Sequence, residues 1–455
     1  MILKKIKTKL ILDLYFLKKE ELYKLSNLVN VKEKNECKKI LNKFPKSLGL
    51  NKIRISKLLN KLGNPHESLP PVIHIAGTNG KGSTVAFIKA GLESRGDKVH
   101  VFTSPHLVDI TERILIAGKK IDLKHFNFLL EKCVKANGNN ELSFFELITA
   151  VAFLAFSRNQ AHWTILEVGL GGRLDSTNVI NSALLSIITP ISMDHQEFLG
   201  NSIKKIAFEK SGIIKENSKV IISKQKNAAL KIIKNKANKV GCKTYTYGID
   251  FKAKYCKNSF LFITKRKKII LPIPLLPGSH QIENASVSIA ALIELKCRKK
   301  NLVDALTNVS WPGRLQKIEK GKLISKNSKL NEEIFLDGGH NKSAGKALSK
   351  WIKNFGNIKF YIILGMMNNK DVYGFLKPIK PYIHKLLAIK IPQQENSYNA
   401  EDILELSNSL NINSQVTGSL EKALQTISNE KTLKPKKILV TGSLYLVGSF
   451  LEQNK

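Results

Sequence analysis

Cysteine is scarce in this chain of 455 residues: there are five, widely scattered, and none forms a C-x-x-C pair. An odd, dispersed set of cysteines excludes a disulfide-built scaffold, is typical of a reducing compartment and argues against a zinc site made of thiolates. Long apolar runs are also missing. The apolar start of the chain (1–21) is interrupted by Lys9 and Asp13, and no small-residue cleavage site follows it. We therefore expect a cytoplasmic protein that crosses no membrane.

Acidic residues are in the minority, because 36 Asp and Glu stand against 74 Lys and Arg, for a formal net charge of +38. Such an excess is typical of proteins that bind polyanions. Only eight of the basic residues are arginines, however, and the lysines are spread along the whole chain. Nucleic-acid readers favour the planar fork of arginine. We interpret the charge as the compositional drift of an AT-rich genome and expect no nucleic-acid partner.

Strand-like apolar stretches alternate with helical spacing from residue 72 onwards. Strands are expected at 72–76, 98–104, 162–168 and 183–190, and helices at 83–94, 122–136 and 144–158. This alternation predicts an α/β fold with a doubly wound, mostly parallel sheet. From 243 to 276 three strand-like stretches follow one another without helices, which predicts a small antiparallel layer, and a helix is expected over 281–298.

A Pro- and Gly-containing segment, WPGRLQ at 311–316, separates two periodic regions. The length of the chain suggests two or three domains, and we place a boundary in this segment. The predicted domains are 1–312 and 313–455. Beyond the boundary, strands are expected at 334–339, 359–367, 385–391 and 436–442, with helical segments between them. The second domain is therefore predicted to be a smaller α/β unit with its own core.

The most specific motif is GTNGKGST at 77–84, which follows a strand and opens a helix. Glycines let backbone N–H groups surround a phosphate, Lys81 supplies a cation, and Ser83 or Thr84 can face a ligand or a metal. In the usual P-loop the lysine directly precedes Ser or Thr, so Gly82 makes this a variant. The plain alternative is a surface Gly-Lys loop. The predicted phosphate-binding residues of the loop are Gly77, Thr78, Asn79, Gly80, Lys81, Gly82, Ser83 and Thr84.

Three polar residues follow or end predicted parallel strands: Ser104, Glu167 and His195. The carboxyl ends of such strands form the ligand-binding edge of an open sheet, and oxygen and imidazole groups suit a magnesium ion that bridges phosphates. Each also has a structural interpretation, respectively a helix cap, a solvated strand end and a packed loop residue.

The variant loop resembles that of the Mur ligase superfamily, and the chain as a whole resembles the folylpolyglutamate synthase/dihydrofolate synthase family. Three of the eight arginines, Arg113, Arg173 and Arg314, fall inside the matching strings. These strings occur in the order of the family: TSPHLVDITERI (103–114), LSFFE (142–146), LEVGLGGRLDSTNVI (166–180), SMDHQEFLG (192–200), FEKSGIIK (208–215), SHQIENA (279–285), WPGRLQ (311–316) and LDGGHN (336–341).

The resemblance implies ATP-dependent amide formation with ATP and Mg²⁺ as cofactors. A substrate carboxylate attacks the γ-phosphate to give an acyl phosphate, and the amine of L-glutamate then displaces phosphate. The acceptor is dihydropteroate, the γ-carboxylate of a reduced folate, or both. This chemistry needs charge neutralisation and no protein nucleophile, which agrees with the lack of a convincing Ser-His-Asp or Cys-His set. The partners are small molecules, and we expect a monomer.

The resemblance also implies roles for particular residues. Ser104, Glu167 and His195 are the magnesium ligands, and Lys210 matches a lysine that becomes carbamylated. A solvated helix lysine is the alternative for Lys210. The implied catalytic residues are Lys81, Lys210 and His195, and the further ATP contacts are Asn284, Arg314 and Asp337. The implied pteroate contacts are Ser143, Phe144, Phe145, Glu146, Leu174, Asp175 and Ser176, with a weaker match at 47–50 (SLGL).

Two other functions stay open at this point. Another Mur-type amide ligase usually carries an N-terminal substrate domain of about a hundred residues, whereas 76 residues precede Gly77 here. A lysine-rich nucleic-acid-binding P-loop protein is the alternative from a different class, and salt-resistant, sequence-dependent binding would support it. The sequence does not separate dihydrofolate synthase from folylpolyglutamate synthase.

Overall fold

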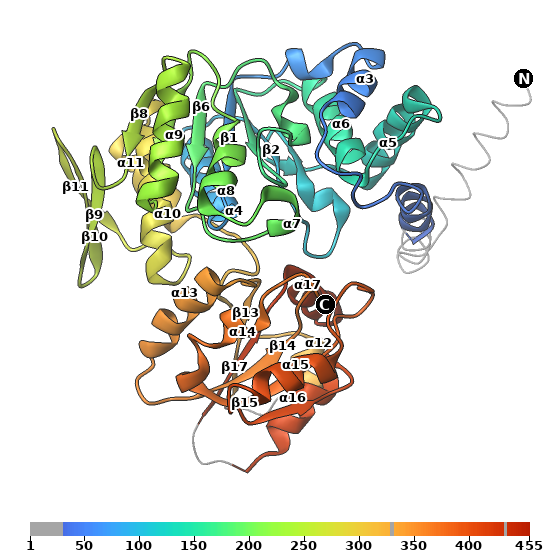
Figure 1. Cartoon of the computed structure of the whole chain (residues 1–455), viewed down its shortest axis with the longest axis vertical. Helices are drawn as coiled ribbons and strands as arrows, with labels where there is room; N and C mark the ends of the chain where they lie inside the picture. The colour runs from blue at the N-terminus through green and yellow to red at the C-terminus, as the bar shows by residue number, and fades with distance from the viewer. Residues whose placement is uncertain (1–30, 328–331, 432–434) are drawn as a thin grey trace, which may run out of the picture.

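The computed structural model describes residues 31–327, 332–431 and 435–455; the N-terminal stretch 1–21 lies outside the described residues. Two α/β units follow one another along the chain. Figure 1 shows the first unit, coloured blue to yellow, stacked on the second, coloured orange to red. The predicted boundary between 312 and 313 stays a prediction.

The first unit contains an eight-stranded sheet with the order β4-β3-β2-β5-β1-β6-β7-β8. Six neighbouring strands, from β2 to β8, are parallel, and β3 and β4 continue the sheet in antiparallel pairing. The strands are β1 (Val72–Ala76), β2 (Val99–Phe102), β3 (Ile114–Ile116), β4 (Lys119–Lys120), β5 (Trp163–Glu167), β6 (Leu185–Ile188), β7 (Lys219–Ile222) and β8 (Lys243–Thr246). The central strands are buried on both faces, as a doubly wound sheet requires.

Alternate residues of the central strands enter different cores. Ile73 and Ile75 of β1 pack against α4 (Lys81–Glu93), α10 (Ser279–Glu294) and α11 (Lys299–Thr307). Val72 and Ala76 face the opposite side. That side is covered by a helix over 31–41 and by α3 (Ile53–Lys61), α5 (Leu123–Asn137), α6 (Phe144–Ser157), α7 (Gln196–Leu199), α8 (Ile203–Ser211) and α9 (Asn227–Lys239). The period of two thus gives the sheet two apolar faces.

A three-stranded antiparallel layer lies beside this sheet, formed by β9 (Phe251–Cys256), β10 (Ser259–Thr264) and β11 (Lys268–Pro272). The predicted layer is confirmed, but its expected first strand is not part of it. That segment is β8, which follows helix α9 and therefore crosses over to pair parallel with β7. The helix expected over 281–298 ends at Glu294, and Lys296 adopts a left-handed φ of 63° before α11 begins.

The second unit contains a six-stranded sheet with the order β12-β13-β17-β14-β15-β16, parallel except for β12. Its strands are β12 (Gln316–Ile318), β13 (Glu332–Asp337), β14 (Phe360–Leu364), β15 (Ile383–Ala388), β16 (Ser414–Val416) and β17 (Lys436–Thr441). Its helices are α12 (Lys322–Asn327), α13 (Lys342–Lys353), α14 (Val372–Leu376), α15 (Ala400–Asn408), α16 (Leu420–Asn429) and α17 (Leu444–Gln453). A separate core covers each face, so the predicted smaller α/β unit is confirmed.

The two sheets present their carboxyl ends to each other. Asn341 follows β13 and donates to Asn79, which follows β1. Lys370 follows β14 and bonds Asp194, which follows β6. The segments that leave the ends of parallel strands therefore meet between the units, where open α/β sheets bind ligands. Among the helices of the described residues, none combines the length and the apolar character that a membrane span requires.

Candidate active site

Residues 77–80 form a turn between β1 and α4, and residues 81–84 are the first turn of α4, as the motif predicts. Gly80 caps α4 with a left-handed φ of 86°, and a side chain there would overlap the amide of Asn284. Glycine is the residue that adopts this backbone conformation without strain. Ser83 and Thr84 are buried in the first turn of α4, with 2% and 0% exposure. The accessible part of the loop is therefore formed by residues 78–81 and not by the hydroxyl groups of Ser83 and Thr84.

Gly82, the residue that makes the loop a variant, has a packing role. A Cβ atom there would lie 2.7 Å from Nε1 of Trp311. Trp311 belongs to the segment 311–316 that joins the two units, so the indole lies directly on the first turn of α4. The extra glycine thus allows the joint between the units to contact the phosphate loop.

Two lysines converge on the backbone of this loop. The ammonium groups of Lys81 and Lys210 donate to the same acceptor, the carbonyl oxygen of Gly77, at 3.2 and 2.9 Å. Lys210 is buried at the end of α8. Burial, together with the charge of Lys81, lowers the pKa of Lys210 to about 7. Its amine is therefore half neutral near pH 7, unlike an ordinary lysine.

Ser104 and Glu167 come together at the ends of β2 and β5. The backbone N–H of Ser104 donates to Oε2 of Glu167 at 3.1 Å. Burial raises the pKa of Glu167, and the charges of Lys81 and Arg314 act against this rise. Both residues line a cavity of about 450 Å³, whose wall also includes Gly82, Trp311 and Arg314. A buried carboxylate and a hydroxyl in one cavity are donors that suit a hard divalent cation.

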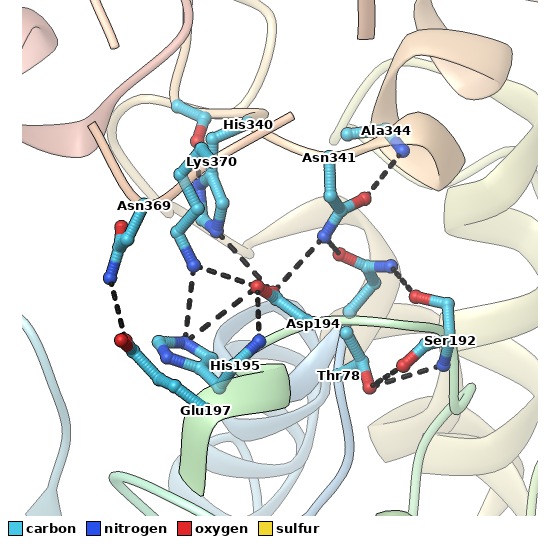
Figure 2. A network of polar contacts seen from close by, with 12 residues as sticks. Thr78, Ser192, Asp194, His195, Glu197, His340, Asn341, Ala344, Asn369 and Lys370 are labelled. Carbon is cyan, nitrogen blue, oxygen red and sulfur yellow. Dashed lines mark hydrogen bonds and ion pairs between the residues drawn. The ribbon is translucent and has the colours of Figure 1, made fainter. Parts of the chain in front are cut away.

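His195, the third predicted ligand, lies in a different polar network. It caps the short helix α7 with a left-handed φ of 50°. Burial lowers its pKa to about 4, so the imidazole is neutral at pH 7. Its Nε2 lies 3.3 Å from Nζ of Lys370, and because an ammonium group can only donate, Nε2 accepts (Figure 2). Among the described residues no cluster of three His, Cys, Asp or Glu side chains could hold a metal by itself.

The remaining predicted ATP contacts lie around the joint. Asn284 is buried on α10 beside Gly80 and donates to Gln281. Asp337 ends β13, and its two oxygens accept from the backbone N–H groups of Leu315 and Gly339 at 3.1 and 2.9 Å. Arg314 lines the cavity from the joint. Arg314 and Glu167 thus line the same cavity, and the carboxylate of Asp337 fastens the joint to β13.

The predicted pteroate residues of the string SFFE open helix α6. Ser143 and Glu146 form a capping box, and Glu146 also accepts from Nε of Arg54 at 3.0 Å. The ring of Phe144 lies under the guanidinium of Arg113, 5.3 Å from its centroid. Phe145 packs against Gly169, where a side chain would clash with its ring. The polar members of the string therefore hold the helix, and the two phenylalanine rings are half-buried beside it.

The second pteroate string lies in the loop after β5. Asp175 is buried and accepts from the backbone N–H of Leu170 and the hydroxyl of Thr177 at 2.8 and 2.6 Å. Ser176 is buried and Leu174 is half-buried. The stretch 47–50 reaches the same region, because Leu50 lies beside Gly171 and the carbonyl of Gly49 accepts from Arg54. The three strings predicted to contact pteroate are thus neighbours.

Sequence reasoning assigned no role to several residues that the structure places between the units. Asp194 contacts His340, Asn341 and Lys370 of the second unit. Its position next to His195 was the available signal. Lys370 had none, because it is one lysine in a chain where lysine is abundant.

A phosphate loop approached by the half-buried Lys81 and the buried Lys210, opposite a second α/β unit, has the arrangement of an ATP-dependent ligase of the Mur type. The Mur ligase middle domain family matches residues 75–292, and the dihydrofolate synthetase C-terminal domain family matches residues 319–453. The chain belongs to the dihydrofolate synthase/folylpolyglutamate synthase family. The predicted α/β fold and ATP-dependent ligase class are thereby confirmed.

Relatives span nearly the whole chain. The dihydrofolate synthetase of Saccharomyces cerevisiae is 33% identical over 425 residues, covering 89% of this chain and 97% of its own. The dihydrofolate synthase/folylpolyglutamate synthase of Bacillus subtilis is 30% identical over 425 residues, covering 88% and 94%. The Escherichia coli FolC structure in complex with DHPP and ADP superposes with a TM-score of 0.82 at 27% identity, covering 92% and 97%. The bifunctional enzyme of Yersinia pestis, complexed with AMPPNP and a Mn ion, has a TM-score of 0.78 at 25% identity, covering 90% and 94%.

The contact between Gly82 and Trp311 generates a first prediction. In Gly82→Ala the new methyl group forces the indole or α4 to move, so kcat/KM for ATP should fall on the order of 10- to 100-fold with little change in thermal stability. Steady-state kinetics and a melting curve measure the two effects. Gly418→Ala is the matched control, because the nearest atom to its added carbon lies at 4.0 Å. Wild-type kinetics in Gly82→Ala would contradict the prediction.

Proposed function

We propose that this chain joins L-glutamate to dihydropteroate, giving dihydrofolate, and adds glutamate to the γ-carboxylate of reduced folates. The observation that carries the proposal is the convergence of Lys81 and Lys210 on Gly77 beside a cavity that contains Glu167 and Arg314. A cationic, partly enclosed site of this kind suits the transfer of a phosphoryl group to a carboxylate.

The reaction follows in two steps. A carboxylate oxygen of the acceptor attacks the γ-phosphorus, the bond to the β-phosphate oxygen breaks, and ADP leaves. The amine of glutamate then attacks the acyl carbon, the C–O bond to phosphate breaks, and the amine loses a proton. In this chain Lys81 and Arg314 supply fixed positive charge for the triphosphate, and the second unit shields the acyl phosphate from water.

We propose that Ser104, Glu167 and His195 hold the magnesium ion. The oxygen donors of Ser104 and Glu167 line one cavity. The lone pair of the neutral imidazole of His195 accepts from Lys370, so a bound metal ion would take the place of this hydrogen bond. The ion, when bound, neutralises charge that develops on the phosphate oxygens. The ATP contacts beyond the loop are Asn284, Arg314 and Asp337.

The acceptor is proposed to lie against Phe144 and Phe145, with the segments 143–146 and 174–176 around it. Flat aromatic rings suit half-buried phenylalanine faces. Dihydropteroate is the favoured acceptor, because the C-terminal family match and the S. cerevisiae relative both bear the name dihydrofolate synthetase. The B. subtilis relative bears both names, which supports folate polyglutamylation as a second activity.

The cytoplasmic location and the monomeric state stay predictions. All five cysteines are free, which agrees with the reducing compartment expected from the sequence.

ADP release by the purified protein tests the proposal. With ATP, Mg²⁺ and L-glutamate present, we expect both dihydropteroate and a reduced folate to stimulate release. Reactions without glutamate serve as the control. Failure of both acceptors to stimulate ADP release and amide formation would contradict the proposed function.

The lowered pKa of Lys210 predicts carbamylation. A neutral amine adds carbon dioxide: an N–C bond forms, one proton is released, and a negative carbamate remains. Because the neutral form increases as pH rises through the pKa of about 7, carbamate should increase between about pH 6 and 8. Carbon-13 NMR with labelled bicarbonate measures it.

Two variants assign the carbon-13 signal of the carbamate to one lysine. The signal should disappear in Lys210→Arg and persist in Lys215→Arg. The second variant removes another lysine, whose pKa burial lowers to about 8. Persistence of the signal in Lys210→Arg would place the carbamate elsewhere.

The aromatic surface generates a further prediction. Phe145→Ala removes a ring face, so KM for dihydropteroate should rise about fivefold or more while KM for ATP stays near the wild-type value. Initial rates at varied acceptor and varied ATP separate the two constants. Phe128→Ala, which removes an exposed phenylalanine of α5, is the control. Equal rises in both constants would argue for a structural role of Phe145.

A further inference from the structure

The carboxylate of Asp194 is a meeting point of the two units (Figure 2). Nζ of Lys370 lies 2.7 Å from its Oδ1. The amide of Asn341 donates to its Oδ2 at 3.3 Å, and Nε2 of His340 lies 3.7 Å from the same atom. Three side chains of the second unit therefore contact one carboxylate of the first.

The pair formed by Asp194 and Lys370 is buried, with each side chain only 9% exposed. Burial of two charges is costly unless the geometry is good, and the loss of one partner leaves the other charge uncompensated. Because the partners belong to different units, their burial requires the closed arrangement. If the units separated, water would solvate both charges, and neither charge would need the other as a partner.

Side chains of this network also contact two predicted ligand sites of the first unit, namely His195 and the phosphate loop. Lys370 donates to Nε2 of His195 at 3.3 Å as well as to Asp194. Asn341 donates to the side chain of Asn79 at 3.0 Å, and Asn79 donates to Ser192 at 3.1 Å. A displacement of the second unit therefore changes the surroundings of His195 and of the phosphate loop at the same time.

We propose that Asp194 and Lys370 are positioning residues that hold the two units closed during the reaction and set the orientation of His195. They act through the arrangement of the units and make no bond to the reacting atoms. The role rests on the proposed ligase function. A weakened pair admits water, which attacks the acyl phosphate and releases the free carboxylate and phosphate, so that ADP forms without amide.

Lys370→Met removes the ammonium group and keeps the approximate length of the side chain. Amide formed per ADP released should fall, and KM for ATP should rise about fivefold or more. KM for dihydropteroate, whose proposed contacts lie in the first unit, should stay near the wild-type value. Lys370→Arg should recover part of the yield. Lys346→Met, which removes an exposed lysine of α13, should behave like the wild type.

A structural role would give a different result. A lower melting temperature with unchanged yield per ADP, or equal rises in both KM values, would overturn the proposal. Asp194→Asn, alone and combined with Lys370→Met, supplies a second test. The losses in yield should be non-additive, because either change breaks the same pair, and additive losses would also overturn the proposal.

Small-angle scattering separates this inference from the proposed function. With an ATP analogue that cannot transfer its γ-phosphate, Lys370→Met should remain more extended than the wild type and Lys346→Met. An unchanged radius of gyration in Lys370→Met would overturn the inference even if the enzyme is an active ligase. Absence of ligase activity in the wild type would contradict the proposed function, and the scattering result would still test whether the pair holds the units together.

Discussion

The opposition of two sets of parallel strands is the constraint on which the site depends. In a parallel sheet every strand delivers its following loop to the same edge, so β1, β5 and β6 place the phosphate loop, Glu167 and Asp194 along one line. The second sheet does the same with its own loops. When the two edges face each other, a ligand between them is contacted from both sides although neither unit encloses it alone. The interdomain hydrogen bonds are therefore a direct consequence of strand direction.

Two positively charged side chains lie close together between the units, and a bound anion would offset their repulsion. Lys81 and Lys210 share the carbonyl of Gly77, and their mutual repulsion adds to the burial of Lys210. Burial disfavours the charged form of a lysine, so the neutral amine becomes more stable and the pKa falls. A triphosphate would relieve the repulsion by its negative charge. A carbamate on Lys210 would relieve it in another way, by turning one of the two like charges into a counter-charge for Lys81.

Much of the fold and part of the site could be predicted from the sequence, because those signals are local. The run VIHIA before a glycine-rich turn predicts β1, the loop and α4 together. The stretch TYTYG (244–248), expected in the antiparallel layer, instead begins within β8 of the large sheet. Strand propensity does not reveal the pairing partner, which the preceding helix α9 decides. The contact between Asp194 and Lys370 joins residues 176 positions apart. No spacing rule predicts such a contact, and an abundant residue type gives no compositional signal.

The joint between the units couples their movement to the phosphate loop because it is fastened at both ends. Trp311 lies on the first turn of α4, where only a glycine at 82 leaves room for the indole. Four residues further on, the N–H of Leu315 donates to the carboxylate of Asp337. A rotation of the second unit must therefore act on α4 through the indole and on β13 through the carboxylate. Arg314 lies between these two attachments, so its guanidinium moves with the joint and can reach the cavity beside Glu167 only in a restricted set of arrangements. A flexible linker could carry the same arginine but could not limit its position in this way.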